Sequence, residues 1–291
     1  MEYEGIVIRP PSEAGSLILQ ATFGCSHNKC SFCPTYKGTR FRIKDQARLE
    51  AEIDEMAGYG PRWSRVFLAD GDALIIPQDR LVRIFDKIAE KMPWIERVGI
   101  YANAKSVLRK SVDELKELRD RKLGIAYFGL ETGDEDLLKE INKGSTTTEM
   151  IEAARRVKAA GILLSVTVLL GIAGKGKGAK HALATAKVLS EMDPDFIGAL
   201  TVMVVPNTPL FDKMERGEYE LPDAFDMLEE LGLMISHTTA TDCLFASNHA
   251  SNYLPIKARL PREQESAVRA IARVLAKRDR AALKPEFLRA L

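Results

Sequence analysis

The sequence predicts an α/β fold with a parallel sheet. Short apolar segments rich in β-branched residues alternate with segments of helical periodicity, and the apolar segments start near residues 16, 65, 98, 124, 162 and 196. Strands that are apolar nearly throughout are typical of a sheet covered by helices, and repeated strand–helix units imply parallel neighbours. Six such units could form either an open doubly wound sheet or a barrel, and the periodicity does not decide between them.

Four of these strands lie in the first half of the chain. Each is a short apolar run, and we expect them at residues 16–22, 65–69, 98–102 and 124–130. The helices between them are marked by apolar residues three and four positions apart. They are expected at residues 47–59, which Gly60-Pro61 terminates, around 81–88, which Pro93 follows, and around 112–118.

The second half continues the alternation and then departs from it. A helix is expected at residues 148–160, with Thr147 or Thr148 as its N-cap, followed by a strand at 162–170, a helix at 179–192 and a strand at 196–205. After residue 210 the alternation stops. Helices are expected at residues 222–236 and 261–277, and the polar segment 237–260 between them is predicted to be irregular.

Composition and charge exclude several classes of protein. The chain has 291 residues, of which 46% are hydrophobic and 29% are charged, as in an ordinary globular protein. Lys and Arg number 42 against 41 Asp and Glu, so there is no strong nucleic-acid signature. No apolar run is long enough to cross a membrane, and the acidic start does not resemble a secretory signal. We therefore expect a cytoplasmic protein, whose cysteines are kept reduced.

Three cysteines are clustered in one loop. Cys25, Cys30 and Cys33 have the spacing C-x4-C-x2-C, and thiolates are ligands for iron–sulfur clusters or zinc. Structural zinc usually takes four ligands, whereas a cubane cluster held by three cysteines keeps one iron open for chemistry. A zinc-binding module remains an alternative, because His27 or Cys243 could complete the set. Cys243 could equally be an inert buried residue.

The cysteine loop resembles the radical S-adenosylmethionine (radical SAM) family. The common motif of that family is CxxxCxΦC, and Phe32 stands at its aromatic position, although the first gap is one residue longer. The resemblance covers residues 15–210. It implies that the three cysteines bind a [4Fe-4S] cluster whose open iron chelates S-adenosylmethionine. It also implies reductive cleavage to a 5′-deoxyadenosyl radical, which abstracts hydrogen from an unidentified substrate, and a flavodoxin- or ferredoxin-like electron donor.

The resemblance also implies an architecture. We expect a partial (β/α)6 TIM-like barrel over residues 1–210, with the cluster loop at 23–39, and a C-terminal helical and irregular extension over 211–291 that packs on and covers the barrel. The match is to the coproporphyrinogen-dehydrogenase-like and cobalamin-associated groups, but we expect no cobalamin-binding domain. The active site would lie at the C-terminal ends of the strands.

Cofactor contacts follow from the same resemblance. Asp70-Gly71-Asp72 resembles the Gly-Gly-Glu motif that holds the methionyl amine, and the segment from Glu131 to Lys143 resembles another segment of the family. For residues 70–72 the alternative is an acidic turn without a ligand, and for Lys143 it is a solvated lysine at a helix end. Ser165 could be present only because its side chain is compatible with a strand. The resemblance implies that Asn103 contacts the ribose, that Glu131 meets the adenosyl or methionyl part and that Lys143 faces the carboxylate of the cofactor. The proposed S-adenosylmethionine contacts are Ala69, Asp70, Gly71, Asp72, Asn103, Glu131, Lys143, Ser165 and Gly171.

A glycine-rich turn suggests a second alternative. Residues 171–178 read G-x4-G-K and follow a predicted strand, as a phosphate-binding loop does. Gly178 stands where that loop needs Ser or Thr, so the Mg2+ ligand is missing. A P-loop-like nucleotide hydrolase is therefore the third hypothesis, after the radical enzyme and the zinc module.

Substrate contacts are the least defined part of the site. Arg42 follows the cysteine loop and could hold a carboxylate or phosphate, although a surface arginine is the commoner case. The polar segment of the extension supplies Asn248, His249 and Asn252, with His249 as a candidate catalytic proton donor or acceptor. A polar loop that satisfies its own backbone is the alternative for these three.

Overall fold

The computed structural model describes residues 3–290, which form two compact units. The first unit contains the chain up to Asn28 together with residues 35–128 and 152–164. The second contains residues 29–34, residues 129–151 and the chain from Ser165 onward. Within residues 3–290, no helix is both long and apolar enough to span a membrane.

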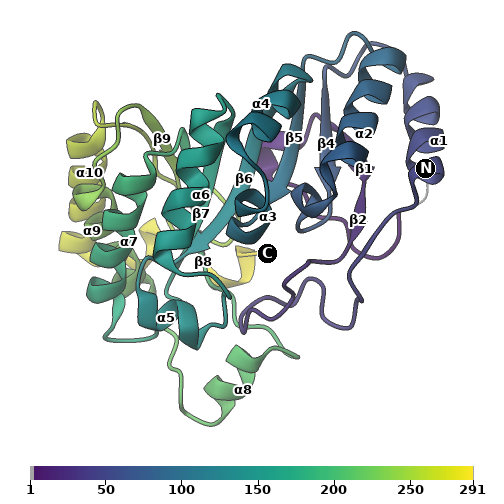
Figure 1. Cartoon of the computed structure of the whole chain (residues 1–291). Helices are drawn as coiled ribbons and strands as arrows, with labels where there is room; N and C mark the ends of the chain where they lie inside the picture. Colours follow the sequence, from purple (N-terminus) through teal and green to yellow (C-terminus); the bar gives the residue numbers. More distant parts are fainter. Residues whose placement is uncertain (1–2, 291) are drawn as a thin grey trace. The chain divides into compact units, whose positions relative to one another are not determined.

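The first unit is a parallel sheet covered by helices. Its strands run in the order β1, β4, β5, β6, and neighbouring strands are parallel. The strands are β1 (Leu17–Gln20), β4 (Arg65–Ala69), β5 (Arg97–Ala102) and the part of β6 (Leu123–Glu131) up to Phe128. Helices α1 (Gln46–Ala57), α2 (Gln78–Lys91) and α4 (Val112–Asp120) lie along the outer side of this sheet (Figure 1). The predicted alternation is confirmed here.

Helix α2 shows why this layering forms. Leu81, Ile84, Phe85 and Ile88 recur at helical spacing and are all buried. One continuous apolar stripe therefore faces the sheet, while the opposite face is charged. Fully burying side chains of this kind stabilises by roughly 1.5–3 kcal/mol each.

A buried polar cluster joins the segment before β1 to the start of β5 and the middle of β6. Glu13, in the short helix η1 (Pro11–Glu13) before β1, is completely buried. Its Oε1 accepts hydrogen bonds of 2.5 Å from Arg97, the first residue of β5, and from the hydroxyl of Tyr127 on β6. Buried carboxylates are tolerated when they are paired and hydrogen-bonded in this way.

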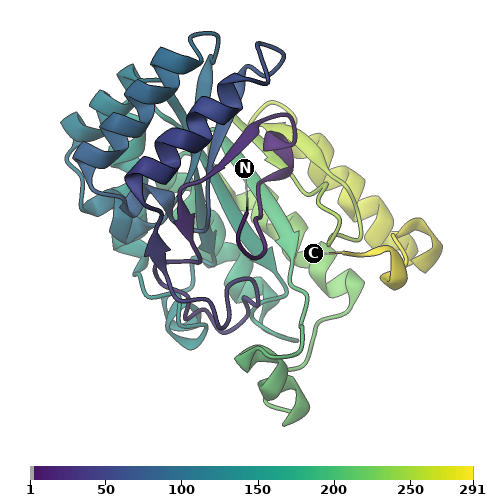
Figure 2. The same cartoon turned by 90° about the vertical axis from the view of Figure 1, so that its right-hand side faces the viewer.

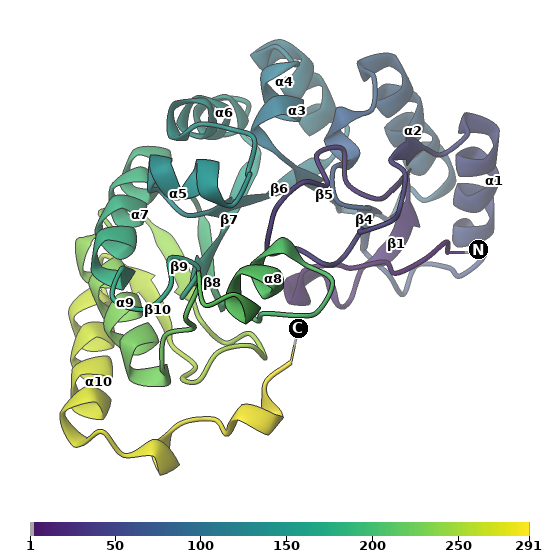
Figure 3. The same ribbon diagram turned by 90° about the horizontal axis from the view of Figure 1, so that it is seen from below.

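The second unit contains a mixed sheet. Strands β7 (Leu163–Leu170, from Ser165 onward), β8 (Phe196–Thr201) and β9 (Cys243–Ala246) are parallel, and β10 (Lys257–Leu260) pairs antiparallel with β9. Helices α7 (Gly178–Met192), α9 (Ala224–His237) and α10 (Gln264–Lys277) lie outside these strands (Figure 3). The remaining helices here are α5 (Glu135–Glu140), the start of α6 (Thr147–Ala159), α8 (Pro209–Glu215), η3 (Arg280–Ala282) and η4 (Glu286–Leu288).

Several predicted boundaries are corrected. Residues 237–260 are not irregular, because they contain β9 and β10, two strands of four residues whose alternating burial is too short to detect by period. The first predicted strand is divided into β1 and β2 (Thr22–Phe23), and β2 pairs with β3 (Arg42–Ile43). The strand predicted to reach residue 205 ends at Thr201.

The other differences between the predicted and the observed elements are short helices. Helices α3 (Ala104–Leu108), α5 and α8 and the 3-10 turn η2 (Ala73–Ile75) have seven residues or fewer, too few to produce a helical period. Helix α8 belongs to an excursion of the chain beyond β8 (Figure 2). Pro209 at its first position and the Thr208 side chain, which accepts from Phe211 N–H, explain why it begins there.

Candidate functional site

In the first unit, the predicted cofactor residues lie just beyond the ends of two adjacent parallel strands. Ala69 is the last residue of β4, and Asp70-Gly71-Asp72 follows it. Asn103 follows β5 and is the N-cap of α3. Because β4 and β5 are parallel, these residues share one edge of the sheet, the edge at which α/β folds place their sites.

Asp72 is the centre of this group. Its side chain is fully buried, and Oδ2 accepts hydrogen bonds from Asn103 Nδ2 at 2.7 Å and from the Ser26 hydroxyl. Among the described residues its other oxygen, Oδ1, is buried with no hydrogen-bond partner. Burial raises the pKa of Asp72 to about 6, against the lowering effect of the Ser26 hydroxyl and other hydrogen-bond donors. An orphaned buried carboxylate oxygen is rare and indicates a missing donor.

Asp70 connects the end of β4 to the cysteine loop. Its Oδ2 accepts from Gln20 Nε2 at 3.0 Å and from Gly24 N–H at 3.2 Å, directly before Cys25. Burial raises the pKa of Asp70, and its Oδ1 is also a buried atom with no hydrogen bond in the described chain. Gly71 allows close approach, because a Cβ there would lie 2.8 Å from the Tyr36 ring and 3.1 Å from Cys25 Cβ.

In the second unit, Glu131 and Lys143 form an ion pair. Lys143 Nζ lies 2.8 Å from Glu131 Oε1, and both side chains are about nine-tenths buried, with 13% and 11% exposure. Glu131 has φ +66°, a left-handed conformation that is uncommon outside glycine and is found at functional sites. A Cβ at Gly129 would lie 2.3 Å from Glu131 Oε1, so the pair also requires that glycine.

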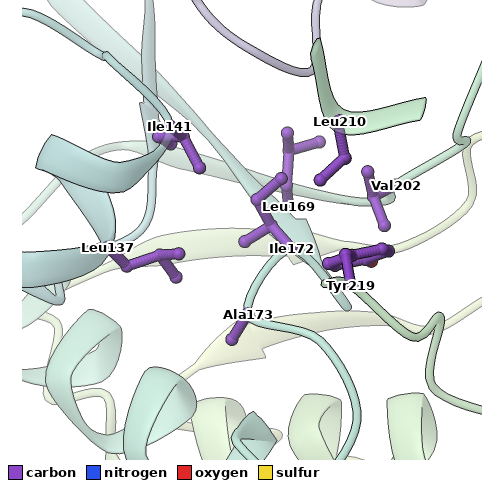
Figure 4. Packing of buried hydrophobic residues seen from close by; sticks show 8 residues of the cluster. All are labelled: Leu137, Ile141, Leu169, Ile172, Ala173, Val202, Leu210 and Tyr219. Atoms are coloured by element: carbon purple, nitrogen blue, oxygen red, sulfur yellow. The ribbon is translucent and has the colours of Figure 1, made fainter. Parts of the chain in front are cut away.

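The segment that carries the other two cysteines is anchored within the second unit. Cys30 and Cys33 are partly exposed, and Phe32 between them packs against a buried apolar cluster. Figure 4 shows the side chains of this cluster, which are Leu137, Ile141, Leu169, Ile172, Ala173, Val202, Leu210 and Tyr219. Ser31 N–H donates to the Ile141 carbonyl at 2.9 Å, and the Ser31 carbonyl accepts from Leu210 N–H at 3.0 Å.

The cysteines are distributed over both units. Cys25, also partly exposed, belongs to the first unit, whereas Cys30 and Cys33 belong to the second. Within residues 3–290, no three His, Cys, Asp or Glu side chains are grouped closely enough to hold a metal ion. Cys243 is buried at the start of β9, the end opposite the predicted site edge, which fits a packing role. The assignment of the three loop cysteines as ligands thus rests on their spacing and chemistry.

Gly171 directly follows β7, as predicted, but its backbone groups are already occupied. Its N–H donates to Glu230 Oε1 at 2.8 Å, and its carbonyl accepts from the Tyr219 hydroxyl at 2.8 Å and from Gly174 N–H at 3.0 Å. Gly171 has φ +80°, and a Cβ there would lie 2.9 Å from Met227 Cε. The position therefore requires glycine for both conformation and space.

Other predicted residues are placed less favourably. Ser165 is the third residue of β7, about 20 Å along the strand from Gly171, so the structure does not bring the two together. Arg42 is exposed, stacks on the Phe23 ring at 3.6 Å and pairs with Glu4. Neither placement supplies a contact to the other predicted residues.

The predicted substrate residues follow β9 and therefore lie at the same edge as the ends of β7 and β8. Asn248 is exposed. Asn252 is buried, with Nδ2 donating to the Ala199 carbonyl at 2.7 Å and Oδ1 accepting from the Thr201 hydroxyl at 2.8 Å. His249 Nδ1 lies 2.9 Å from the Ser251 hydroxyl and accepts from Ser251 N–H at 3.2 Å. Burial, then Lys284, lowers the pKa of His249.

Sequence reasoning missed four residues that shape these sites. Ser26 contacts Asp72, and Tyr219 and Glu230 contact Gly171, yet nothing in their local sequence connects them to those partners. His181, near the start of α7, carries no functional signal in the sequence and is fully buried. The only sequence signal for Glu230 is an acidic residue on the apolar face of a predicted helix.

Comparison with known proteins identifies the family. The model of the radical SAM superfamily matches residues 19–187. An uncharacterized protein of Methanocaldococcus jannaschii is 23% identical over 214 residues, which are 69% of this chain and 64% of that protein. Heme chaperone HemW of Bacillus subtilis is 23% identical over 196 residues, which are 66% of this chain and 51% of that protein.

A solved structure shares the fold. The radical S-adenosylmethionine methyltransferase TsrM of Kitasatospora setae, solved with cobalamin and a [4Fe-4S] cluster bound, superimposes with a TM-score of 0.55 at 20% identity. The match covers 67% of this chain and 38% of that one. The chain spans about half to two thirds of the length of the curated relatives described above. At these identities the structural likeness confirms the predicted fold, a partial TIM-like barrel of α/β type, and not the substrate.

Proposed function

Because the chain belongs to the radical SAM superfamily, and is thus a radical SAM enzyme that binds a [4Fe-4S] cluster and S-adenosylmethionine, we propose that it cleaves S-adenosylmethionine reductively to a 5′-deoxyadenosyl radical that abstracts hydrogen from a substrate. The observation that carries this proposal is the C-x4-C-x2-C loop with its anchored Phe32. The cluster supplies the electron, and the protein supplies binding, orientation and exclusion of water. The family match favours this reading over the zinc module and the P-loop hydrolase.

Cys25, Cys30 and Cys33 are the proposed cluster ligands. Three thiolates are a suitable donor set for iron–sulfur chemistry, and all three cysteines are partly exposed. Phe32 and the two backbone hydrogen bonds of Ser31 restrict the conformation of the segment between the last two cysteines. The protein thereby supplies a partly preorganised loop.

Asp72 is the proposed acceptor for the methionyl ammonium group. Its orphaned Oδ1 is buried and would gain a donor, and a cation there would favour the ionised carboxylate. Asn103 Nδ2 donates to Asp72, while Asn103 Oδ1 accepts from Ser106 N–H at 2.9 Å. Its amide is therefore committed, which supports a role in orienting Asp72 rather than the predicted ribose contact.

Glu131 and Lys143 are proposed to meet the polar part of the cofactor as a pair. The resemblance predicts that Lys143 faces a carboxylate, and it already faces that of Glu131. A ligand carboxylate would share this cation, and the lysine would hold Glu131 in place for a hydroxyl or amine. Ala69, Asp70 and Gly71 in the first unit and Gly171 in the second remain proposed cofactor contacts, and Ser165 is the weakest of the predicted contacts.

His249 is the proposed hydrogen-bond donor toward the substrate. Nδ1 accepts from Ser251 N–H, so a neutral ring carries its hydrogen on Nε2. The lowered pKa keeps the ring neutral near pH 7. The exposed Asn248 is a second substrate candidate, whereas Asn252 and Arg42 are committed to internal contacts. The electron is proposed to come from a flavodoxin- or ferredoxin-like protein in the cytoplasm, where the thiols stay reduced.

The test uses protein purified and reconstituted without oxygen. We expect about four irons and four sulfides per chain, an EPR signal of the reduced protein that S-adenosylmethionine perturbs, and formation of 5′-deoxyadenosine. Cys30→Ala should abolish all three. Cys243→Ala is the matched control and should retain iron, because Cys243 lies buried at the start of β9. One zinc per chain, no iron after reconstitution and no cleavage would refute the proposal.

A further inference from the structure

A buried carboxylate from a distant helix supports the glycine-rich turn after β7. Glu230 lies on α9, 59 residues from Gly171, and its side chain is only 1% exposed. Oε1 accepts the Gly171 N–H at 2.8 Å. Oε2 lies at the start of α7, since a Cβ built on Gly178 would be 2.9 Å from it. One carboxylate thus contacts both ends of the turn, 171 and 178.

His181 places Glu230 within a larger buried network. His181 Nε2 lies 3.3 Å from Glu230 Oε1 and 3.2 Å from the Leu169 carbonyl. Because both neighbours are acceptors, Nε2 must carry the hydrogen. In the neutral ring, Nδ1 then accepts from the Thr132 hydroxyl, which is 2.8 Å away.

The network connects two strand ends that carry predicted cofactor residues. Thr132 directly follows Glu131 at the end of β6, and Gly171 directly follows β7. Thr132 Oγ1 also accepts from Asp134 N–H at 3.0 Å, and the Tyr219 hydroxyl holds the Gly171 carbonyl at 2.8 Å. The peptide groups on both sides of Gly171 are consequently clamped by side chains from the segment that leads into α9 and from α9 itself.

We infer that Glu230, supported by His181 and together with Tyr219, is a positioning residue that sets the shape of the 171–178 turn and thereby the affinity for S-adenosylmethionine. The inference rests on the proposed function, because it assumes that the turn meets the cofactor. The physical reason is that the buried Glu230 carboxylate depends on the turn for one of its hydrogen bonds. A buried carboxylate is costly unless it is satisfied, and the groups that satisfy Glu230 are the turn's own N–H and His181. Neither Glu230 nor His181 needs to touch the cofactor.

The test separates affinity from chemistry. In Glu230→Gln, the acceptor at Oε1 either becomes an uncharged amide oxygen or, with the amide rotated, is replaced by an NH2 group that faces the Gly171 N–H. We expect the S-adenosylmethionine concentration for half-maximal 5′-deoxyadenosine formation to rise about ten-fold, the equivalent of one charge-assisted hydrogen bond. The rate at saturating S-adenosylmethionine and the EPR signal of the reduced protein without it should not change. Equilibrium dialysis with labelled S-adenosylmethionine should give the same shift in affinity.

The matched control is Glu13→Gln, the same substitution at a buried carboxylate in the first unit, which bonds to the start of β5 and the middle of β6. It should lower stability without changing the affinity for S-adenosylmethionine. Tyr219→Phe is the milder second variant, which removes only the hydroxyl on the Gly171 carbonyl and should weaken binding a few-fold. It keeps the test informative if Glu230→Gln does not fold.

The outcomes are distinguishable. Wild-type affinity in folded Glu230→Gln, or in Tyr219→Phe where the former does not fold, would overturn the inference. Equal loss of affinity in Glu13→Gln would also overturn it, because the effect would then be one of general stability. Wild-type protein that neither binds nor cleaves S-adenosylmethionine would instead refute the proposed function.

Discussion

Asp72→Asn should make the cofactor-free protein more stable at neutral pH. Burial raises the pKa of Asp72 to about 6 in the folded protein, whereas an aspartate in an unfolded chain titrates near 3.9. This difference corresponds to a penalty of about 3 kcal/mol for the ionised folded form. An asparagine has no such penalty. It can keep its oxygen toward Asn103 and Ser26, but its NH2 takes the place of the orphaned Oδ1, at a cost of about 1 kcal/mol.

The sign of the pH dependence follows from the raised pKa. Below about pH 3.9 both states are protonated and the stability that Asp72 contributes is fully present. As pH rises through 3.9 the unfolded state loses its proton first, so the folded state becomes less favoured until pH exceeds 6. The penalty is about 1.5 kcal/mol at pH 5 and about 3 kcal/mol at pH 8. The advantage of the variant should therefore grow by about 1.5 kcal/mol between these values.

Anaerobic urea unfolding of both proteins at pH 5 and pH 8, without S-adenosylmethionine, measures this difference. The variant should simultaneously lose affinity for S-adenosylmethionine, since stability and function oppose each other at such a residue. Asn103→Ala, which removes one donor to the same carboxylate, should instead destabilise the protein at pH 8. Equal stability differences at the two pH values would refute the reasoning, because they would show that Asp72 is not an ionised, under-solvated group.

Three other expectations concern the second unit. Gly133→Ala should lower the free energy of unfolding in urea by about 1–3 kcal/mol, because its Cβ would lie 2.4 Å from the Ala184 carbonyl oxygen. Gly232→Ala, inside α9 with its Cβ 3.4 Å from Ile271, should raise that free energy by up to about 1 kcal/mol. The reverse order of stabilities would contradict the packing described. Asn252→Ala should lower stability by about 2 kcal/mol without altering the affinity for S-adenosylmethionine, measured by dialysis, because its amide serves Ala199 and Thr201. Lys143→Met should weaken that affinity and cost about 1–3 kcal/mol by leaving Glu131 without its cation; unchanged binding would remove Lys143 from the site.

The sequence predicts an element correctly wherever the hydrophobic pattern of that element alone identifies it. Strand β4 is predicted at residues 65–69 and is found there, so the position of the acidic turn at a strand end follows from the sequence alone. Helix α2 is equally predictable from its apolar stripe. These features depend only on residues within a few positions of one another.

Tertiary contacts explain what could not be predicted. The contact between Glu230 and Gly171 joins residues 59 positions apart, and it depends on how α9 packs, which no local pattern encodes. Ser26 reaches Asp72 across 46 positions in the same way. Strand β9 is not predicted because Cys243–Ala246 is too short to show a period, with only two buried residues in alternation. The predicted site residues are therefore held in part by residues that a motif search does not find.

The buried Glu13 cluster has a consequence for how this protein can change over time. It joins η1 to the first residue of β5 and to the middle of β6, whereas the proposed cofactor residues lie where β4 and β5 end. Substitutions in the loops beyond Ala69 and Ala102 leave these bonds untouched. The first unit can thus accept new side chains in these loops, around a different substrate, while its sheet stays folded. Because the stabilising contacts and the loops are separate, related enzymes can change their loops without losing the fold.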